Sequence, residues 1–366
     1  MKLTCNGNDL SAAVGQVYKA VSTKTLNPLL EGILITAENG ALTMLATDLE
    51  IAIERVIPAD VKIEGKTVVP GRFFAEFVKK LTNERIELSL ADSKLKIKYT
   101  ESQGFLQCMS ADEFPSVKEL TDAQKFTIVR RELKDLIQKI AFAVSLDDTR
   151  PLLKGVLLEV EDATLTGVAL DGYRLAKCVK QIEKTTALMR VVVPARSIAE
   201  IARILDDSQD FVEVSVQKNH LSIHLNHTKI TTQLLDGDYL NYKQILPTNF
   251  DTLVTIPKEL FEAGVERAML LAKQEKSNLV KFEIKGDVLK LESNSEIGNL
   301  SEKIPVKLTG PEITIAFNAR YFIELLRFTQ ADHIDIKFTN ATSPCVVVPH
   351  SGTEDFLYLV LPVRIL

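Results

Sequence analysis

The sequence lacks most signals of an exported, membrane-bound or disulfide-stabilised protein. No run approaches the roughly 18 uninterrupted apolar residues of a membrane span. The N-terminus, MKLTCNGNDLS, has no apolar core of a signal peptide. The four cysteines (Cys5, Cys108, Cys178 and Cys345) form no CxxC motif and no paired spacing. These absences favour a reduced cytoplasmic protein and argue against a disulfide framework or a zinc site.

Catalytic motifs are also absent. There is no Gly-rich phosphate loop, GxSxG, HExxH or kinase signature. The segment HLSIHLNH offers His220, His224 and His227 as a possible metal cluster. In a strand, however, His220 and His224 share one face and His227 points the other way. No acidic residue or cysteine lies at ligand spacing. We therefore expect a solvated strand face, with no catalytic residue, metal or cofactor.

The length and composition fit a soluble, well-cored protein. The chain has 366 residues, of which 46% are hydrophobic and 25% charged. This length allows three domains of ordinary size, two larger domains or one large barrel. An internal repeat is therefore the feature that must decide between them.

Three segments repeat the same helical pattern at a constant offset. They are TVVPGRFFAEFVKKL at 67–81, VVVPARSIAEIARIL at 191–205 and ITIAFNARYFIELLRF at 313–328. A basic, acidic, basic triplet recurs in them at a spacing of 124 residues. Its members are Arg72, Glu76 and Lys79, then Arg196, Glu200 and Arg203, then Arg320, Glu324 and Arg327. Three such triplets at one offset indicate three related domains.

The other half of each repeat agrees with this interpretation. Amphipathic helices of equal length are expected at 8–22, 131–145 and 258–272, each followed by two strands. Alternating residues predict further strands at 94–99, 212–217 and 333–338. Two helices against antiparallel strands make each domain α+β. We place the domains at 1–122, 123–247 and 248–366.

The Asp171-Gly172-Tyr173-Arg174 segment allows two interpretations. An acid and a tyrosine side by side could serve an enzyme. Asp-Gly is also typical of a turn that ends a strand, and Asp48 occupies the equivalent place one repeat earlier. We favour the structural turn and keep the enzyme as an alternative.

Charge is unevenly divided along the chain. The net charge is −5, yet the six expected helices together carry +6, which leaves −11 for the remainder. For this count the helices are taken as 9–24, which includes Lys24, and as 70–81, 131–142, 196–205, 258–273 and 319–328. Helices are ordinary places for lysine and arginine, so this bias alone is modest. The basic pairs 72/79, 196/203 and 320/327 are more specific, because residues seven apart share a helical face. Such faces suit the backbone phosphates of nucleic acid.

The motifs taken together resemble a known family. DGYRLA at 171–176, LLDGDYLNYKQILP at 234–247, AFNARYFIELL at 316–326 and the terminal LPVRIL are similar to the bacterial DNA polymerase III β subunit, the sliding clamp. The resemblance covers the whole chain. It implies the DNA clamp fold: three repeated domains, helices lining the inside, antiparallel sheets outside, and a head-to-tail dimeric ring around duplex DNA.

The resemblance also implies three sets of site residues. The DNA-binding set is Lys24, Arg72, Lys79, Arg150, Arg196, Arg203, Arg320 and Arg327. The dimer interface is expected at the edge strands near Phe105–Cys108 and Ser295–Lys303, with Phe105, Leu106, Leu271 and Ala272 in contact. The partner-peptide groove is expected at Leu153, Leu170, Gly172, Tyr173, Arg174, Leu175, Leu240, Ile245, Asn318, Tyr321, Thr342, Pro344, Val360, Leu361, Pro362, Val363 and Arg364.

The resemblance therefore predicts a non-enzymatic processivity factor. Its expected partners are double-stranded DNA bound without sequence preference, the DNA polymerase III alpha subunit and other polymerases, the clamp loader and a second copy, with no membrane. The family usually has an aromatic pair just after the place of Arg150, where this sequence has Pro151 and Leu152. The alternative is a repeat-built adaptor that binds proteins without encircling DNA.

Overall fold

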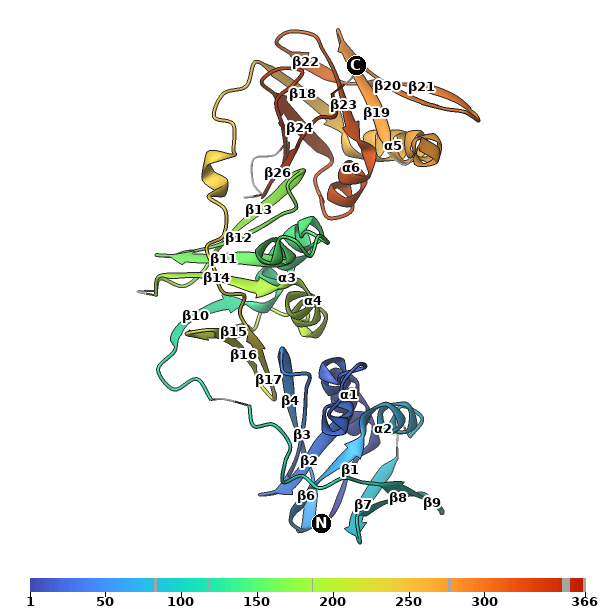
Figure 1. Ribbon diagram of the computed structural model, residues 1–366, viewed down its shortest axis with the longest axis vertical. Coiled ribbons are helices and arrows are strands. Elements are labelled where there is room, and N and C mark those ends of the chain that lie inside the picture. The colour runs from blue at the N-terminus through green and yellow to red at the C-terminus, as the bar shows by residue number, and fades with distance from the viewer. Residues whose placement is uncertain (82–83, 118, 186, 276–277, 351–355, 365–366) are drawn as a thin grey trace. The chain divides into compact units, whose positions relative to one another are not determined.

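The computed structural model describes residues 1–366 except 82–83, 118, 186, 276–277, 351–355 and 365–366 (Figure 1). The chain divides into two compact units. Unit 1 contains Met1–Arg130 and Ala199–Leu234, and unit 2 contains Arg131–Ile198 and Leu235–Leu366. Each strand pair that the structure describes between named strands is antiparallel, which confirms the expected α+β class.

Unit 1 contains a five-stranded and an eight-stranded sheet among its described residues. The five-stranded sheet has the order β5 (Asp60–Ile63), β1 (Lys2–Asn6), β7 (Arg85–Ala91), β8 (Lys94–Tyr99), β9 (Ser102–Gln107). The eight-stranded sheet has the order β10 (Gln124–Val129), β15 (Phe211–Gln217), β16 (His220–Leu225), β17 (Thr228–Gln233), β4 (Ile51–Pro58), β3 (Ala41–Thr47), β2 (Gly32–Glu38), β6 (Gly65–Pro70). Helix α1 (Gly7–Val17) packs against α2 (Gly71–Val78) and β4.

Unit 2 contains a nine-stranded and a four-stranded sheet among its described residues. The nine-stranded sheet has the order β14 (Met189–Pro194), β11 (Gly155–Glu161), β12 (Thr164–Leu170), β13 (Arg174–Gln181), β26 (Phe356–Val360), β25 (Cys345–Pro349), β24 (His333–Phe338), β18 (Thr252–Pro257), β22 (Lys307–Thr309). The four-stranded sheet has the order β21 (Gly298–Pro305), β20 (Val288–Ser295), β19 (Leu279–Lys285), β23 (Ile313–Asn318). Helices α5 (Lys258–Ala272) and α6 (Ala319–Leu326) pack together.

Helices α3 (Arg130–Ile140) and α4 (Ala195–Ile204) complete the six that the repeat predicts. Short 3₁₀ turns also occur in the described chain. They are η1 (Tyr18–Ala20), η2 (Pro28–Glu31), η3 (Ala141–Ala143), η4 (Pro151–Lys154), η5 (Tyr242–Gln244) and η6 (Lys273–Glu275).

Two strand pairs join repeats that are far apart in sequence. In unit 1, β17 pairs with β4, with Ile230 opposite Ile53. In unit 2, β13 pairs with β26, with Leu175 opposite Leu359 (Figure 1). The expected domain 123–247 therefore supplies strands to both units. The boundaries of the compact units differ from those of the sequence repeats, because backbone hydrogen bonds continue each sheet past the end of a repeat.

Local sequence explains most of the elements. In β8, the buried Leu95 and Ile97 alternate with lysines, which is the period-2 pattern of a half-buried strand. Helix α1 begins after Asn6, whose Oδ1 accepts from the amides of Asn8 (2.8 Å) and Asp9 (3.3 Å). Helix α6 begins in the same way after Asn318, whose Oδ1 accepts from the Arg320 amide at 3.1 Å.

Three expectations about the helices are wrong in detail. Helix α1 ends at Val17 and continues only as η1, so Lys24 lies in a loop. Side chains there satisfy the backbone locally: Thr25 Oγ1 accepts from the Asn27 amide at 3.0 Å. Helix α3 ends at Ile140, and residues 141–143 form η3. The helices that open the repeats are also unequal, with 11 residues in α1 and α3 and 15 in α5.

Candidate partner groove and nucleic-acid interface

The segment between β12 and β13 is a tight turn, as the sequence predicts. Asp171 Oδ1 accepts from the amides of Tyr173 (2.9 Å) and Arg174 (3.1 Å). Gly172 has φ 94°, a left-handed conformation that favours glycine. A Cβ at this glycine would lie 2.9 Å from Arg150 Nη1, so Arg150 packs directly over the turn. Asp171 therefore serves the turn.

Arg174 is buried at the centre of this region, with 7% of its side chain exposed. Its Nε donates to Asp171 Oδ2 (3.0 Å), and its Nη2 donates to the Phe142 carbonyl (2.8 Å). Nη1 donates to Glu324 Oε2 and lies 3.5 Å from Tyr358 Oη. Burial alone would lower the pKa of Arg174, but Tyr358 and Glu324 together raise it. This guanidinium is thus held charged inside the protein.

Aromatic rings surround the same guanidinium. Its Cζ lies 4.7 Å from the Tyr321 ring centroid and 5.8 Å from that of Phe142. Both distances fall in the range of cation–π attraction. Burial and the nearby Asp171 charge raise the pKa of Tyr321, so its phenol is neutral at physiological pH. Tyr321, in the first turn of α6, is therefore fixed by a residue of β13.

The expected groove residues form a buried floor and an exposed rim. Leu153, Leu170 and Leu175 belong to one core cluster that also contains Tyr239, Tyr242, Val346 and Leu359. Val360 is buried as well. The rim residues expose large apolar surfaces: Tyr173 (64%), Leu240 (50%), Ile245 (40%), Val363 (40%) and Leu361 (37%). An exposed apolar surface of this kind is typical of a binding site.

The C-terminal segment lies along this surface. The Leu361 amide donates to the Tyr173 carbonyl at 2.9 Å, and the Val363 amide donates to the Ala316 carbonyl at 2.8 Å. Pro362 is half-buried and Arg364 is exposed. Pro344 precedes Cys345, which pairs with Val360, so it also lies near the segment. Thr342 is exposed in a turn. Asn340 Oδ1 caps this turn by accepting a hydrogen bond from the Thr342 amide at 2.9 Å.

Sequence reasoning overlooked the polar residues beneath the groove. Glu324, Tyr358 and Phe142 all contact Arg174, yet none was expected to serve the site. Glu324 carried a signal, since it repeats with Glu76 and Glu200 at a spacing of 124 residues. The sequence could not give its partner, because Arg174 is 150 residues away.

The eight expected DNA-binding cations are all exposed. Within the repeated triplets, however, several are paired with the repeated glutamate. Arg72 Nε lies 3.2 Å from Glu76 Oε1, and Arg320 Nε lies 2.7 Å from Glu324 Oε1. Arg203 pairs with Glu200. The arginine of each pair is exposed, so a phosphate from the solvent can compete for it.

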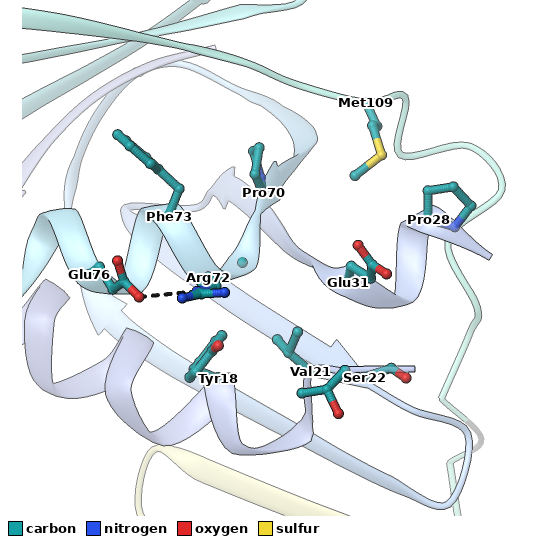
Figure 2. A pocket seen from close by; sticks show the side chains of 12 residues that line it. Tyr18, Val21, Ser22, Pro28, Glu31, Pro70, Arg72, Phe73, Glu76 and Met109 are labelled. Carbon is teal, nitrogen blue, oxygen red and sulfur yellow. Dashed lines mark hydrogen bonds and ion pairs between the residues drawn. The ribbon is translucent and has the colours of Figure 1, made fainter. Parts of the chain in front are cut away.

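A pocket of about 700 Å³ lies where α2 begins in unit 1 (Figure 2). Tyr18, Val21, Pro28 and Met109 supply its apolar lining. Figure 2 also shows Glu31 and the ion pair of Arg72 with Glu76. Phe73 lines this pocket and occupies the repeat position that Tyr321 occupies two repeats, or 248 residues, later. The start of α2 is thus the counterpart of the part of the groove that α6 supplies.

The three histidines of the HLSIHLNH segment do not lie on one strand. His227 lies in the turn after β16 rather than on the strand, so its expected position is wrong. His224 Nε2 lies 3.2 Å from Ser222 Oγ, and burial lowers its pKa. No group of three His, Cys, Asp or Glu residues within the described chain could hold a metal ion. Nor is any described helix long and apolar enough to cross a membrane.

Comparison with known proteins gives the family. Models of the DNA polymerase III beta subunit match its N-terminal domain at residues 1–118, its central domain at 127–241 and its C-terminal domain at 243–364. The chain belongs to the DNA polymerase III beta subunit family. Its three clamp domains are the three repeats that the sequence predicts.

Similar beta-subunit proteins match over nearly the whole chain. The beta sliding clamp of Halalkalibacterium halodurans is 34% identical and covers 96% of each chain. That of Bacillus subtilis is 33% identical and covers 100% of each. The crystal structure of the Bacillus subtilis DNA polymerase sliding clamp superimposes with a TM-score of 0.96 over 100% of both chains, at 31% identity.

The expected dimer residues of this beta-family chain lie on two edge strands and at the end of helix α5. Strand β9 is one edge of the five-stranded sheet and carries Phe105, which is 60% exposed. Strand β21 is one edge of the four-stranded sheet. Leu106 and Leu271 are half-buried, whereas Ala272 is 1% exposed and packs inside its own domain. Leu270, which was not expected, is 69% exposed.

Proposed function

We propose that this chain is a DNA polymerase processivity factor that acts as a closed ring of two copies around duplex DNA. The observation that carries the proposal is the match of all three beta-subunit domains along the chain. The ring slides because its phosphate contacts are many, weak and independent of sequence. A polymerase bound to the ring then stays at high effective concentration near its template.

We assign DNA contact to the exposed cations of the repeats. These residues are Lys24, Arg72, Lys79, Arg150, Arg196, Arg203, Arg320 and Arg327. Lys24 would reach DNA from its loop, and Arg150 from beside the Gly172 turn. Glutamate pairing keeps several of these contacts weak, which suits a ring that must move.

We assign partner binding to the groove of unit 2. Its exposed leucine, isoleucine, valine and tyrosine side chains suit short hydrophobic peptides from the polymerase III alpha subunit, other polymerases and the clamp loader. The proposed groove keeps the seventeen residues expected from the sequence, with Tyr321 and the 361–364 segment at its centre. The proposed domain boundaries stay at 122/123 and 247/248.

Head-to-tail closure would pair the β9 edge with the β21 edge of a second copy. An unpaired edge strand offers a row of free N–H and C=O groups to another strand. Phe105 would add apolar area, and Leu271 would pack across the contact. We propose no catalytic role for the chain and a place in the cytoplasm, with ring opening supplied by an external ATP-driven loader.

The test of the ring is topological. The protein is loaded by a clamp loader onto nicked circular DNA, and half of the sample is then linearised. We expect retention on the circle and loss from free ends, measured by gel filtration. Equal retention on both forms would refute encirclement, and binding of polymerase without retention on circles would favour the adaptor.

The test of the groove uses Tyr321→Ala and removal of residues 361–366. Either change should weaken binding of a labelled polymerase peptide by roughly 10- to 30-fold, the effect of losing a central aromatic contact. Phe211→Ala is the matched control, because Phe211 is an exposed aromatic on β15, outside the groove. Unchanged affinity of the Tyr321 variant would place the groove elsewhere.

A further inference from the structure

One carboxylate touches both proposed sites of unit 2. Glu324 Oε2 accepts from Arg174 Nη1 beneath the groove. Its other oxygen, Oε1, accepts from Arg320 Nε at 2.7 Å. The two arginines differ in surroundings, since the Arg174 side chain is 7% exposed and that of Arg320 is 57% exposed. Glu324 itself is 18% exposed, so water screens its charge only partly.

The fold explains why this glutamate has two partners. Arg320 is four residues before it on α6, the spacing at which helical side chains meet. Arg174 reaches it from β13, which pairs with the C-terminal strand β26. In the first repeat, Glu76 accepts from Arg72 alone among the residues that the structure describes, and its side chain is 70% exposed. The double pairing thus distinguishes Glu324 from Glu76.

We propose that Glu324 is a positioning residue that couples the two sites, so that DNA contact at Arg320 tightens peptide binding in the groove. This inference rests on the proposed function, because it assumes that Arg320 meets phosphate and that the groove binds peptide. The proposed coupling goes beyond that function, because each site could bind its ligand without any effect on the affinity of the other site.

The direction of the coupling follows from how Arg174 and Arg320 share the negative charge of Glu324. Without DNA, the single charge of Glu324 serves two guanidinium groups. When a phosphate draws Arg320 away, the full charge acts on Arg174. Arg174 then holds Asp171 and the Tyr321 ring more firmly in place. A groove that is already ordered loses less conformational freedom when the peptide binds, so its affinity rises.

The reverse effect must have the same size. Coupling between two binding sites is reciprocal, so bound peptide must strengthen DNA binding by the same factor. Arg320 is largely exposed, and its pair with Glu324 is therefore weak. We expect a factor of about five, at the low end of measured site-to-site couplings.

The experiment measures peptide affinity with and without DNA. A fluorescein-labelled peptide from a DNA polymerase III alpha subunit is titrated with full-length protein and followed by fluorescence anisotropy. The titration is repeated with saturating short duplex DNA at low salt. In the natural sequence the duplex should tighten peptide binding about fivefold. Glu324→Gln should reduce this ratio to about one.

Arg320→Gln keeps the test decisive if Glu324→Gln disturbs folding, because Arg320 is exposed on the surface of α6. This variant should also lose the coupling. Glu76→Gln is the matched control, since it alters the same repeat position in the N-terminal domain, far from Arg174 in sequence. It should keep the fivefold ratio.

The outcomes separate the coupling from the proposed function. Failure of the natural protein to bind either peptide or duplex would refute the proposed function. Binding of both with a ratio of one would refute the coupling alone. An unchanged ratio in both Glu324→Gln and Arg320→Gln would also overturn it, as would loss of the ratio in Glu76→Gln.

Discussion

Arg174→Met tests whether the buried guanidinium holds the central and C-terminal domains together. The substitution keeps much of the side-chain volume but removes the charge and the donors. It leaves the Asp171 carboxylate, with 15% of its side chain exposed, and the Glu324 carboxylate, with 18%, without their buried cation. The Phe142 carbonyl also loses its donor.

The expected cost follows from these orphaned groups. Removing one partner of a buried ion pair costs about 3–5 kcal/mol, because an uncompensated charge remains in a poorly solvated place. Glu324 retains Arg320 and Asp171 retains its turn amides, so we expect about 3 kcal/mol, the lower end of that range. The triple variant Arg174→Met, Glu324→Gln, Asp171→Asn removes the stranded charges and should recover about half of that loss.

Urea unfolding followed by circular dichroism measures the change, since the chain has no tryptophan to report fluorescence. The control is Arg190→Met. Arg190 Nε lies 3.0 Å from Glu159 Oε1, but the Arg190 side chain is 45% exposed. Because water screens Arg190, and because Glu159 keeps its hydrogen bond from the Tyr242 hydroxyl (2.7 Å), the loss of this pair should cost about 1 kcal/mol or less.

Two results would refute this reasoning. One is a loss below about 1 kcal/mol for Arg174→Met, similar to the Arg190 control. The other is a triple variant that is less stable than the single one, since removing the stranded charges must help if they cause the loss. A loss of peptide binding without a loss of stability would mean that Arg174 acts on the groove alone.

Three further predictions follow from the same structure. Lys180 lies 2.6 Å from both Glu132 and Asp135. Although burial disfavours both charges, these contacts raise the pKa of Lys180 and, with Lys139, lower the pKa of Asp135. The stability lost in Lys180→Met should therefore be constant from about pH 5 to pH 10, and it should shrink in acid as Asp135 is protonated and in alkali as Lys180 is deprotonated. A stability difference that does not change with pH in urea titrations would contradict this. Arg327→Gln should reduce the salt slope of duplex binding by about 0.9 for each phosphate that the variant no longer neutralises, and an unchanged slope would remove Arg327 from the DNA-binding set. All four cysteines are buried, and burial raises the pKa of the Cys5 thiol to about 12, so a thiol reagent should react slowly until denaturant is added. Rapid labelling of the native protein would disprove this.

The sequence predicted local structure well. The repeated triplets located α2, α4 and α6, and alternation located β8, β15 and β24, because both signals act within a few residues. The pairing of β4 with β17 and of β13 with β26 could not be predicted. Which distant strand edges meet depends on the tertiary arrangement, and no residue pattern within Ile51–Pro58 indicates that this strand pairs with Thr228–Gln233.

The groove shows the same division. The turn at Asp171 followed from Asp-Gly chemistry, while the set of groove residues came only from family resemblance. The polar contacts beneath could not be foreseen, because Arg174 meets Glu324 and Tyr358 across 150 and 184 residues of chain. Lys24 was predicted in a helix but lies in a loop. Helical periodicity of the apolar residues does not reveal that the Thr25 side chain accepts a hydrogen bond from the Asn27 amide, which stabilises the loop.

The continuous sheets set a limit on how this protein can be divided into fragments. A fragment cut at 247/248 would strip β26 from β13, so the backbone groups from Arg174 to Cys178 that face β26 would lose their partners, while β12 would still cover the other edge of the strand. A cut at 122/123 would likewise uncover β4 by removing β17. Bare edges of this kind recruit other chains and promote aggregation. The units that keep both sheets whole are each assembled from two separate stretches of chain, so no simple truncation of the gene can encode either one.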